Sequence, residues 1–223
     1  MPPVNPNRSL GMALIALALA FNLPYARLAA TFDYPAILRE TPETILASLA
    51  AGGSGLIATW YAFAACALIF APLAMAQALG QGRAQRAPAL AIAAAIAGAF
   101  AGILQAMGLL RWVLVMPALA EMPDAATTFT ALHAFGGAVI GEHLGQLATA
   151  LHVGLMAAIH RGEGHRALPL AGGLTAALIT MGSFETPALA LGLSGELFAL
   201  ASIAGYLALT LWLILAGTSL IRR

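Results

Sequence analysis

The sequence contains no lysine, a single cysteine and very little charge of either sign. Arginine supplies all 10 basic residues, nine acids oppose them, and charged residues make up only 9% of the 223 residues. A soluble domain carries about 25% charged residues, so a soluble globular fold and a disordered chain are both excluded. The net charge of +1 also lacks the basic excess that nucleic-acid-binding proteins show.

The only cysteine, Cys66, lies within an apolar run. The chain therefore has no second thiol for an intramolecular disulfide or for a cysteine-based zinc site. What the sequence has in excess is apolar side chains, which make up 61% of it, compared with about 45–50% in soluble domains. We predict an all-α integral membrane protein that forms a single domain over residues 1–223.

Six apolar runs meet or approach the length that a transmembrane helix needs, which is about 20 residues. The predicted transmembrane helices cover residues 10–26, 54–79, 88–110, 132–159, 168–184 and 195–220. The first run also has the character of a signal peptide, but residues 28–30 form a poor cleavage site. We therefore expect the first span to be retained.

The charges between these spans alternate in sign from one side to the other. One predicted side carries seven arginines and one acid, namely Arg8, Arg83, Arg86, Arg161, Arg166, Arg222, Arg223 and Glu163. The other side carries three arginines and seven acids, namely Arg27, Arg39, Arg111, Asp33, Glu40, Glu43, Glu121, Asp124, Glu185 and Glu196. The positive-inside rule then places both termini in the cytoplasm, and we expect the chain to lie in the inner membrane of the cell.

Short helices are expected on the outer surface. Thr41 at the N-cap, Pro42 at the first helical position and Glu43 in the first turn are typical of a helix start, and Gly52 and Gly53 are expected to end that helix. We expect its apolar face to lie on the membrane surface. Residues 112–122 form a second candidate surface element, and the tryptophans Trp60, Trp112 and Trp212 are expected to be interface anchors or lipid-facing residues.

Small residues recur at a spacing of four in two consecutive spans. They are Ala94, Gly98, Gly102 and Ala106 in the third span, and Gly137, Gly141 and Gly145 in the fourth. Small side chains let helix backbones approach closely in a membrane, so we expect these two spans to pack together. The alternative is a homo-oligomer that forms through the glycine stripe.

The fourth span carries most of the polar residues that need an explanation, because ionisable groups are costly inside a membrane. Counting from the inner ends, Glu142 in the fourth span and Arg111 in the third reach a similar outer depth, which predicts an ion pair. At 100° per residue, Gln146 and Thr149 lie on the same stripe as Glu142. His143 lies to one side of that stripe and His152 to the other.

All five histidines, His133, His143, His152, His160 and His165, lie in or beside the fourth span. His143 and His152 face opposite ways about 13 Å apart, so one helix cannot supply both ligands of a metal ion or haem. We therefore expect no metal, no cofactor and no catalytic residue. A haem protein with ligands from two chains is the less favoured alternative.

Several sequence blocks resemble a bacterial family of multispanning proteins that is known as a domain of unknown function. The blocks cover residues 32–39, 60–63, 109–113, 117–120, 141–145 and 211–215, and the Leu-Leu-Arg-Trp-Val and Gly-Glu-His-Leu-Gly blocks are the most specific. The family more often has tryptophan at the position of His152, which weakens a ligand role for that histidine. The resemblance implies a membrane-embedded six-helix fold and no particular activity.

These observations predict a site rather than a reaction. The candidate ligand-binding residues are Arg111, Glu142, His143 and Gln146, which would form an outward-facing polar pocket between the third and fourth spans. Arg111 would take an anionic group with Glu142 as its resting counter-ion, and His143 would couple the pocket to protons. Besides membrane lipid, the expected partner is a small-molecule ligand. The alternatives are an accessory subunit of a membrane complex, or an enzyme with Glu142 or His143 as general base.

Overall fold

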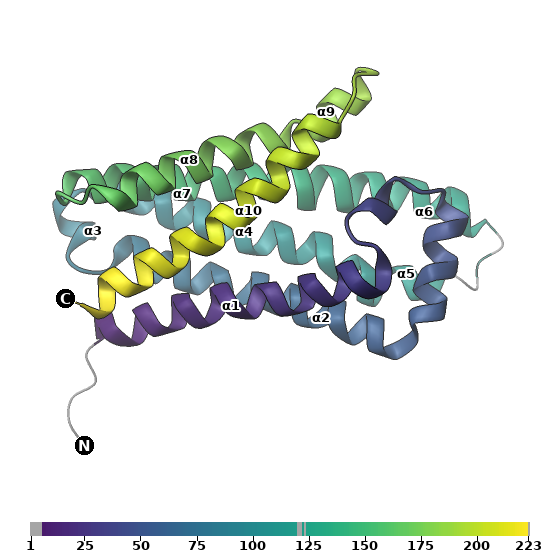
Figure 1. Cartoon of the computed structure of the whole chain (residues 1–223), viewed down its shortest axis with the longest axis horizontal. Helices are drawn as coiled ribbons and strands as arrows, with labels where there is room; N and C mark the ends of the chain where they lie inside the picture. Colours follow the sequence, from purple (N-terminus) through teal and green to yellow (C-terminus); the bar gives the residue numbers. More distant parts are fainter. Residues whose placement is uncertain (1–5, 120–121, 123, 223) are drawn as a thin grey trace.

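The computed structural model describes residues 6–119, 122 and 124–222, and within this part of the chain the regular structure is entirely helical (Figure 1). Ala120, Glu121, Pro123 and Arg223, which the sequence assigns to loops or a terminus, lie outside the described residues. Five helices are long and apolar enough to cross a membrane, judged by length and composition. They are α1 (Pro6–Phe32), α2 (Pro42–Leu79), α4 (Pro88–Leu114) with α5 (Met116–Leu119), α8 (Ala167–Ser183) with α9 (Glu185–Ala190), and α10 (Glu196–Ile221).

The fourth predicted span is a composite rod. It begins with α6 (Ala125–Leu132), continues as the 12-residue π-helix η2 (His133–Leu144) and ends as the 18-residue α7 (Gly145–Gly162). The sequence predicts six apolar transmembrane helices, and the described residues contain five long apolar helices and this composite rod. This rod differs because it carries the histidines and Glu142, and because its hydrogen-bond pattern changes at Gly145, whose N–H donates to the Ile140 carbonyl in an i→i+5 bond.

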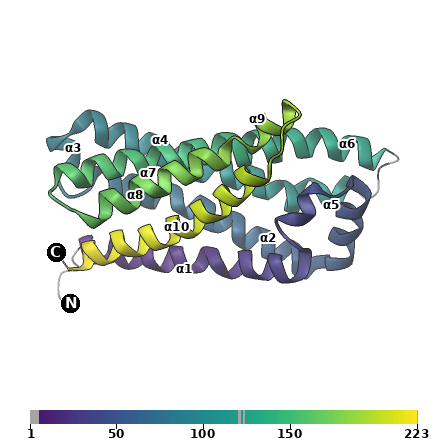
Figure 2. The same cartoon turned by 45° about the horizontal axis from the view of Figure 1, so that its top comes forward.

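The short elements outside this rod are η1 (Ala36–Arg39), α3 (Arg83–Arg86), α5 and α9. We call the end of the bundle where α1 begins and α10 ends the terminal end, and the opposite end the distal end. The helix α3 lies at the terminal end, whereas η1, α5 and α6 lie at the distal end (Figures 1 and 2).

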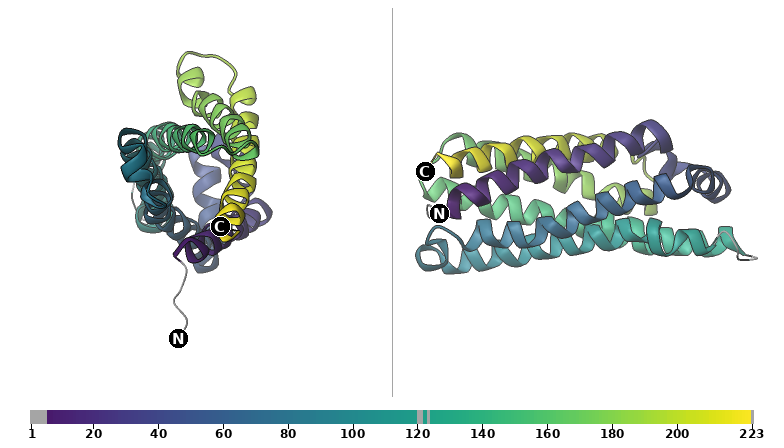
Figure 3. Two further views of the ribbon diagram at one scale, coloured as in Figure 1. Left: turned by 90° about the vertical axis from the view of Figure 1, so that its left-hand side faces the viewer. Right: turned by 90° about the horizontal axis from the view of Figure 1, so that it is seen from below.

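Six helical rods form a closed ring. In chain order, α1 packs against α2, α2 against α4, α4 against η2 and α7, α7 against α8, and α8 against α10, which closes against α1. An end-on view shows this arrangement (Figure 3). The closing contact is tight at the terminal end, where a Cβ atom on Gly11 would lie 2.5 Å from the Gly217 carbonyl oxygen.

The helix that begins at Pro42 starts as the sequence predicts, because the Thr41 hydroxyl accepts a hydrogen bond from the Thr44 N–H. It also breaks where predicted, at Gly53, which has φ 54° and ψ −152°. The prediction for its apolar face is wrong. Ile45 and Leu49 are buried in a cluster of protein side chains rather than turned toward the membrane surface.

The expected membrane-interface role of the tryptophans is also wrong. Trp60, Trp112 and Trp212 are at most 1% exposed. Trp60 and Trp112 belong to the distal cluster, and Trp212 belongs to the main core between the rods. Tryptophan favours the membrane interface only when its indole faces lipid. Here the arrangement of the helices turns all three indoles toward the protein interior.

The small residues pack helix against helix within the chain. A Cβ atom on Gly102 would lie 2.6 Å from the Ala67 carbonyl oxygen on α2. A Cβ atom on Gly108 would lie 2.6 Å from the Cα of Gly141 on η2. The helix α4 therefore uses its small residues on both neighbouring rods, and the glycines offered for an oligomer contact are covered inside the ring.

An ionic cluster, which we call the terminal clamp, joins two connections at the terminal end. Arg83 Nε and Nη2 donate to the two carboxylate oxygens of Glu163 at 2.7 Å and 2.9 Å, and Arg86 Nη2 lies 3.3 Å from Glu163 Oε1. The Arg83 side chain is only 2% exposed. The clamp ties the start of α3 to the end of α7.

Candidate functional site

A cavity of about 620 Å³ lies inside the ring and extends from mid-bundle to the distal end. This volume falls in the range of small-molecule sites, about 300–1,000 Å³. Its wall is formed by α1, α2, α4, α6, η2, α7, α9 and α10, together with the connection between α1 and α2. The polar lining residues are Asn22, Tyr25, Tyr34, Arg39, Glu40, Gln105, Arg111, Thr130, His133, Glu142, Gln146, Thr149, Glu185, Thr186, Ser202, Tyr206 and Thr210.

Arg111 lines this cavity from the last turn of α4 and is 8% exposed. Its Nη1 donates to the Gly108 carbonyl, and its Nη2 lies 3.5 Å from His133 Nδ1. Its Nε is buried and has no hydrogen-bond partner among the described residues. The guanidinium fits because position 137 is glycine, where a Cβ atom would lie 2.5 Å from Nη2.

Glu142 lines the same cavity from the last turn of η2. The predicted ion pair with Arg111 is not formed, since no basic group of the described residues lies within 4.0 Å of the Glu142 carboxylate. The carboxylate also has no hydrogen-bond partner in the described part of the chain. The reason is the path of the Arg111 side chain, which turns along its own helix toward Gly108 and into the space above Gly137.

Gln146 lies one turn further along the rod and contributes to the cavity wall. Its Nε2 donates to Ser202 Oγ of α10 at 3.0 Å, whereas its Oε1 is buried and has no described partner. On the neighbouring side, Gln105 Nε2 donates to Thr149 Oγ1 at 2.6 Å. Hydrogen bonds therefore join polar side chains of α4, α7 and α10 across the cavity, and the Gln146 Oε1 acceptor has no hydrogen-bond partner among the described residues.

His143 does not line the cavity. Its Nδ1 lies 2.7 Å from the carbonyl oxygen of Ser183, and because a carbonyl only accepts, Nδ1 carries the proton in this bond. Its ring meets Phe184 at an angle of 75°. The structure brings Arg111, Glu142 and Gln146 to one cavity and places His143 against the end of α8.

His152 is also held away from the cavity. Its Nδ1 donates to the Ala94 carbonyl at 2.9 Å, and its side chain is fully buried. Gly98 makes room for the ring, since a Cβ atom there would lie 2.8 Å from Nδ1. In the described part of the chain, no group of three or more His, Cys, Asp or Glu side chains is placed to hold a metal ion.

Aromatic rings form one wall of the cavity at its distal end. Trp60 and Trp112 are stacked with centroids 5.1 Å apart, and Tyr34 meets Trp60 edge-on at 5.2 Å. Burial raises the pKa of the Tyr34 phenol above its ordinary value, the Glu142 carboxylate raises it further, and Arg111 lowers it. Tyr34 thus lies within electrostatic reach of both charged groups.

An ion pair spans the distal end of the cavity, between Arg39 of η1 and Glu185 at the start of α9. Both residues also line the cavity. The contact links segments that are 146 residues apart in the chain. The sequence places both charges on one side of the membrane, but no spacing rule pairs them.

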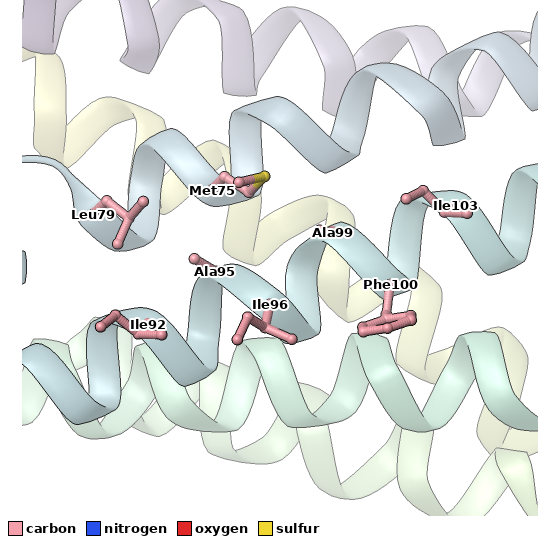
Figure 4. Close-up of a pocket in the computed structure, with 8 residues that line it drawn as sticks. All are labelled: Met75, Leu79, Ile92, Ala95, Ile96, Ala99, Phe100 and Ile103. Carbon is pink, nitrogen blue, oxygen red and sulfur yellow. The ribbon is translucent and has the colours of Figure 1, made fainter.

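A second hollow of about 400 Å³ lies on α2 and α4 and is lined only by apolar side chains (Figure 4). Ile92, Ile96 and Phe100 of α4 are each more than half exposed. Such a surface is what a lipid-facing side of a membrane helix requires, and it offers no polar group to orient a ligand.

Fold and site together define an all-helical protein of the multi-pass membrane type with a polar cavity inside its helix ring. The chain belongs to the family described as Domain of unknown function (DUF4386), which matches residues 9–217. Comparisons with curated proteins and with solved structures found no match.

Proposed function

We propose that the protein spans a bacterial inner membrane six times, with both termini in the cytoplasm, and binds a small ligand in the cavity from the outer side. The ligand carries an acidic group that Arg111 binds. In this orientation the arginine-rich terminal end faces the cytoplasm, as the positive-inside rule requires. The rod of η2 and α7 is then the fourth span.

One observation carries the proposal. Arg111 is a buried cation that faces a cavity, with a free Nε donor and no carboxylate within 4.0 Å among the described residues. Buried charges in proteins are normally paired. Among the described residues the guanidinium contacts the Trp112 ring, at 4.8 Å from the ring centroid, and no carboxylate. A guanidinium prefers the planar geometry of a carboxylate or phosphate, so an acidic ligand group would supply the anionic partner that the described residues do not.

The proposal can be tested with monododecyl phosphate as the probe and dodecanol, which lacks the acidic group, as its neutral counterpart. The full chain in dodecyl maltoside should gain thermal stability from the phosphate and not from the alcohol, because ligand binding stabilises the folded state by mass action. Arg111→Ala should abolish the gain, whereas Arg111→Lys should retain part of it.

Arg27→Ala is the matched control, since Arg27 is exposed and does not line the cavity. It should keep the full response to monododecyl phosphate. An equal response in the Arg111→Ala protein, or no response in the unaltered chain, would exclude Arg111 as an anion-binding residue.

A further inference from the structure

The cavity holds two opposite charges that do not form a contact ion pair. Arg111 and Glu142 both face it, yet their side chains are not within ion-pair distance, and the Glu142 carboxylate has no hydrogen-bond or ionic partner among the described residues. An unpaired carboxylate is costly in a membrane interior. The Glu142 carboxylate therefore needs a cationic or hydrogen-bonding partner of its own, separate from the group that Arg111 would bind.

We propose that the ligand is a zwitterionic amphiphile, whose acidic group binds Arg111 and whose ammonium group binds Glu142. This inference rests on the proposed function and names the class of ligand. The aromatic wall supports the ammonium assignment, because aromatic ring faces attract ammonium groups. Tyr34 belongs to that wall and lies within electrostatic reach of Glu142 and Arg111.

The polarity of the cavity changes with depth. The charged side chains, Tyr25 and Tyr34 lie toward the distal end, and Ala67, Phe70 and Leu213 line the deepest part. Between them, the cavity is lined by the uncharged polar groups of Asn22, Thr149, Tyr206 and Thr210. Trp60 and Phe70 both line the cavity from α2, and their separation of ten residues corresponds to about 15 Å along a helix. A headgroup at the distal end with an apolar tail directed toward mid-bundle matches this gradient.

The proposed ligand would enter along the seam between α1 and α10. The two helices are in contact near Gly11 and Gly217, and they separate toward the distal end (Figures 1 and 2). A hydrogen bond from Asn22 Nδ2 to Thr210 Oγ1, at 3.2 Å, joins them midway. Beyond it, Tyr25 on α1 faces the same cavity as residues of α10, so the distal part of the seam borders the cavity directly.

The same headgroup chemistry occurs in a membrane phospholipid and in a soluble zwitterion. Dioctanoyl phosphatidylethanolamine and glycerophosphoethanolamine carry identical charged groups, and only the first has tails. The full chain in dodecyl maltoside can be titrated with each, with tryptophan fluorescence as the readout because Trp60 and Trp112 line the cavity. Dioctanoyl phosphatidic acid, which lacks the ammonium group, is the reference ligand.

The unaltered chain should bind dioctanoyl phosphatidylethanolamine at least tenfold more tightly than dioctanoyl phosphatidic acid. Glu142→Gln should reduce this preference to about onefold without weakening the binding of phosphatidic acid. Glu142→Asp, which keeps the charge, should retain part of the preference and serves if Glu142→Gln does not fold. Glu43→Gln changes an exposed acid that does not line the cavity and should leave the preference intact.

The outcomes separate this inference from the proposed function. The zwitterion assignment is overturned if the chain shows no preference for the ammonium lipid, or if Glu142→Gln retains that preference. If the binding of phosphatidic acid still depends on Arg111, the proposed anion site stands. If neither lipid shows binding that depends on Arg111, both the zwitterion assignment and the proposed function are overturned. If glycerophosphoethanolamine competes saturably with the lipid, the ligand is a soluble zwitterion. If the lipid binds and glycerophosphoethanolamine does not compete, the ligand is a phospholipid.

Discussion

Replacing Gly108 with alanine tests whether the contact between α4 and η2 builds the site. The added Cβ atom would lie 2.6 Å from the Cα of Gly141, whereas carbon atoms pack best at about 3.5–4.0 Å. The obstacle is backbone rather than a movable side chain, so the two rods must separate by about 1 Å. Arg111 is one turn beyond Gly108, and Glu142 follows Gly141, so the separation also displaces both charged groups.

The expected cost follows from two opposing effects. Overpacking of this kind costs about 1–3 kcal/mol, and the higher helix propensity of alanine returns at most about 1 kcal/mol. Because the obstacle is backbone, the upper part of the overpacking range applies, and Gly108→Ala should lower the free energy of unfolding by about 1–2 kcal/mol once the propensity gain is subtracted. Gly141→Ala should cost less, because its Cβ atom would lie 3.0 Å from the Cα of Gly108.

The measurement is unfolding of the full chain in mixed micelles as the fraction of sodium dodecyl sulfate rises, followed by far-ultraviolet circular dichroism. Gly154→Ala is the matched control on α7, since its Cβ atom would make an ordinary 3.7 Å contact with the Ala176 Cβ. Its stability should be unchanged or slightly raised. A Gly108→Ala protein as stable as the Gly154→Ala protein would refute the argument that this backbone contact is close-packed.

Three further predictions concern the site, the terminal end and the topology. Gly137→Ala should displace the Arg111 guanidinium and reduce the thermal stabilisation by monododecyl phosphate. Gly136→Ala should not, because its Cβ atom would make an ordinary 3.7 Å contact with Arg111 Cδ. Equal thermal stabilisation in the two variants would contradict this geometry. In the terminal clamp, Arg83→Ala should cost about 2–3 kcal/mol in chemical unfolding because it removes two charge-assisted hydrogen bonds to the partly buried Glu163 carboxylate. Arg86→Ala, at a side chain that is 59% exposed, should cost less than about 1 kcal/mol. A fluorescent protein fused to the C-terminus should fold and fluoresce in the bacterial cytoplasm, and a dark fusion of full length would reverse the proposed orientation.

Much of the fold follows from local sequence signals. Apolar runs predict the five long apolar helices, and the Thr41-Pro42 cap and the break at Gly53 lie where the sequence indicates. These features depend on the residue itself and its near neighbours, on an N-cap hydroxyl or on a positive φ that glycine adopts at little cost. Such signals can be identified from one sequence, without knowledge of contacts between distant segments.

The burial of the tryptophans was not predictable in the same way. The helix α2 is apolar on all sides, so its sequence does not indicate which face is turned inward. That choice is made when α10 closes the ring of helices against α1, and when Trp60 stacks on Trp112 and meets Phe32 edge-on. Contacts between distant segments decide it, and no periodicity in one helix carries that information.

The site illustrates the same division at the level of single side chains. Helical spacing correctly groups Glu142, Gln146 and Thr149 on one wall, because positions on a rod are set by local geometry. It does not fix the direction of the Arg111 side chain, which depends on the space that Gly137 leaves and on the Gly108 carbonyl. Equal depth therefore suggests a neutral pair, whereas the structure leaves a cation and an anion facing one cavity. The proposed ligand site rests on that difference.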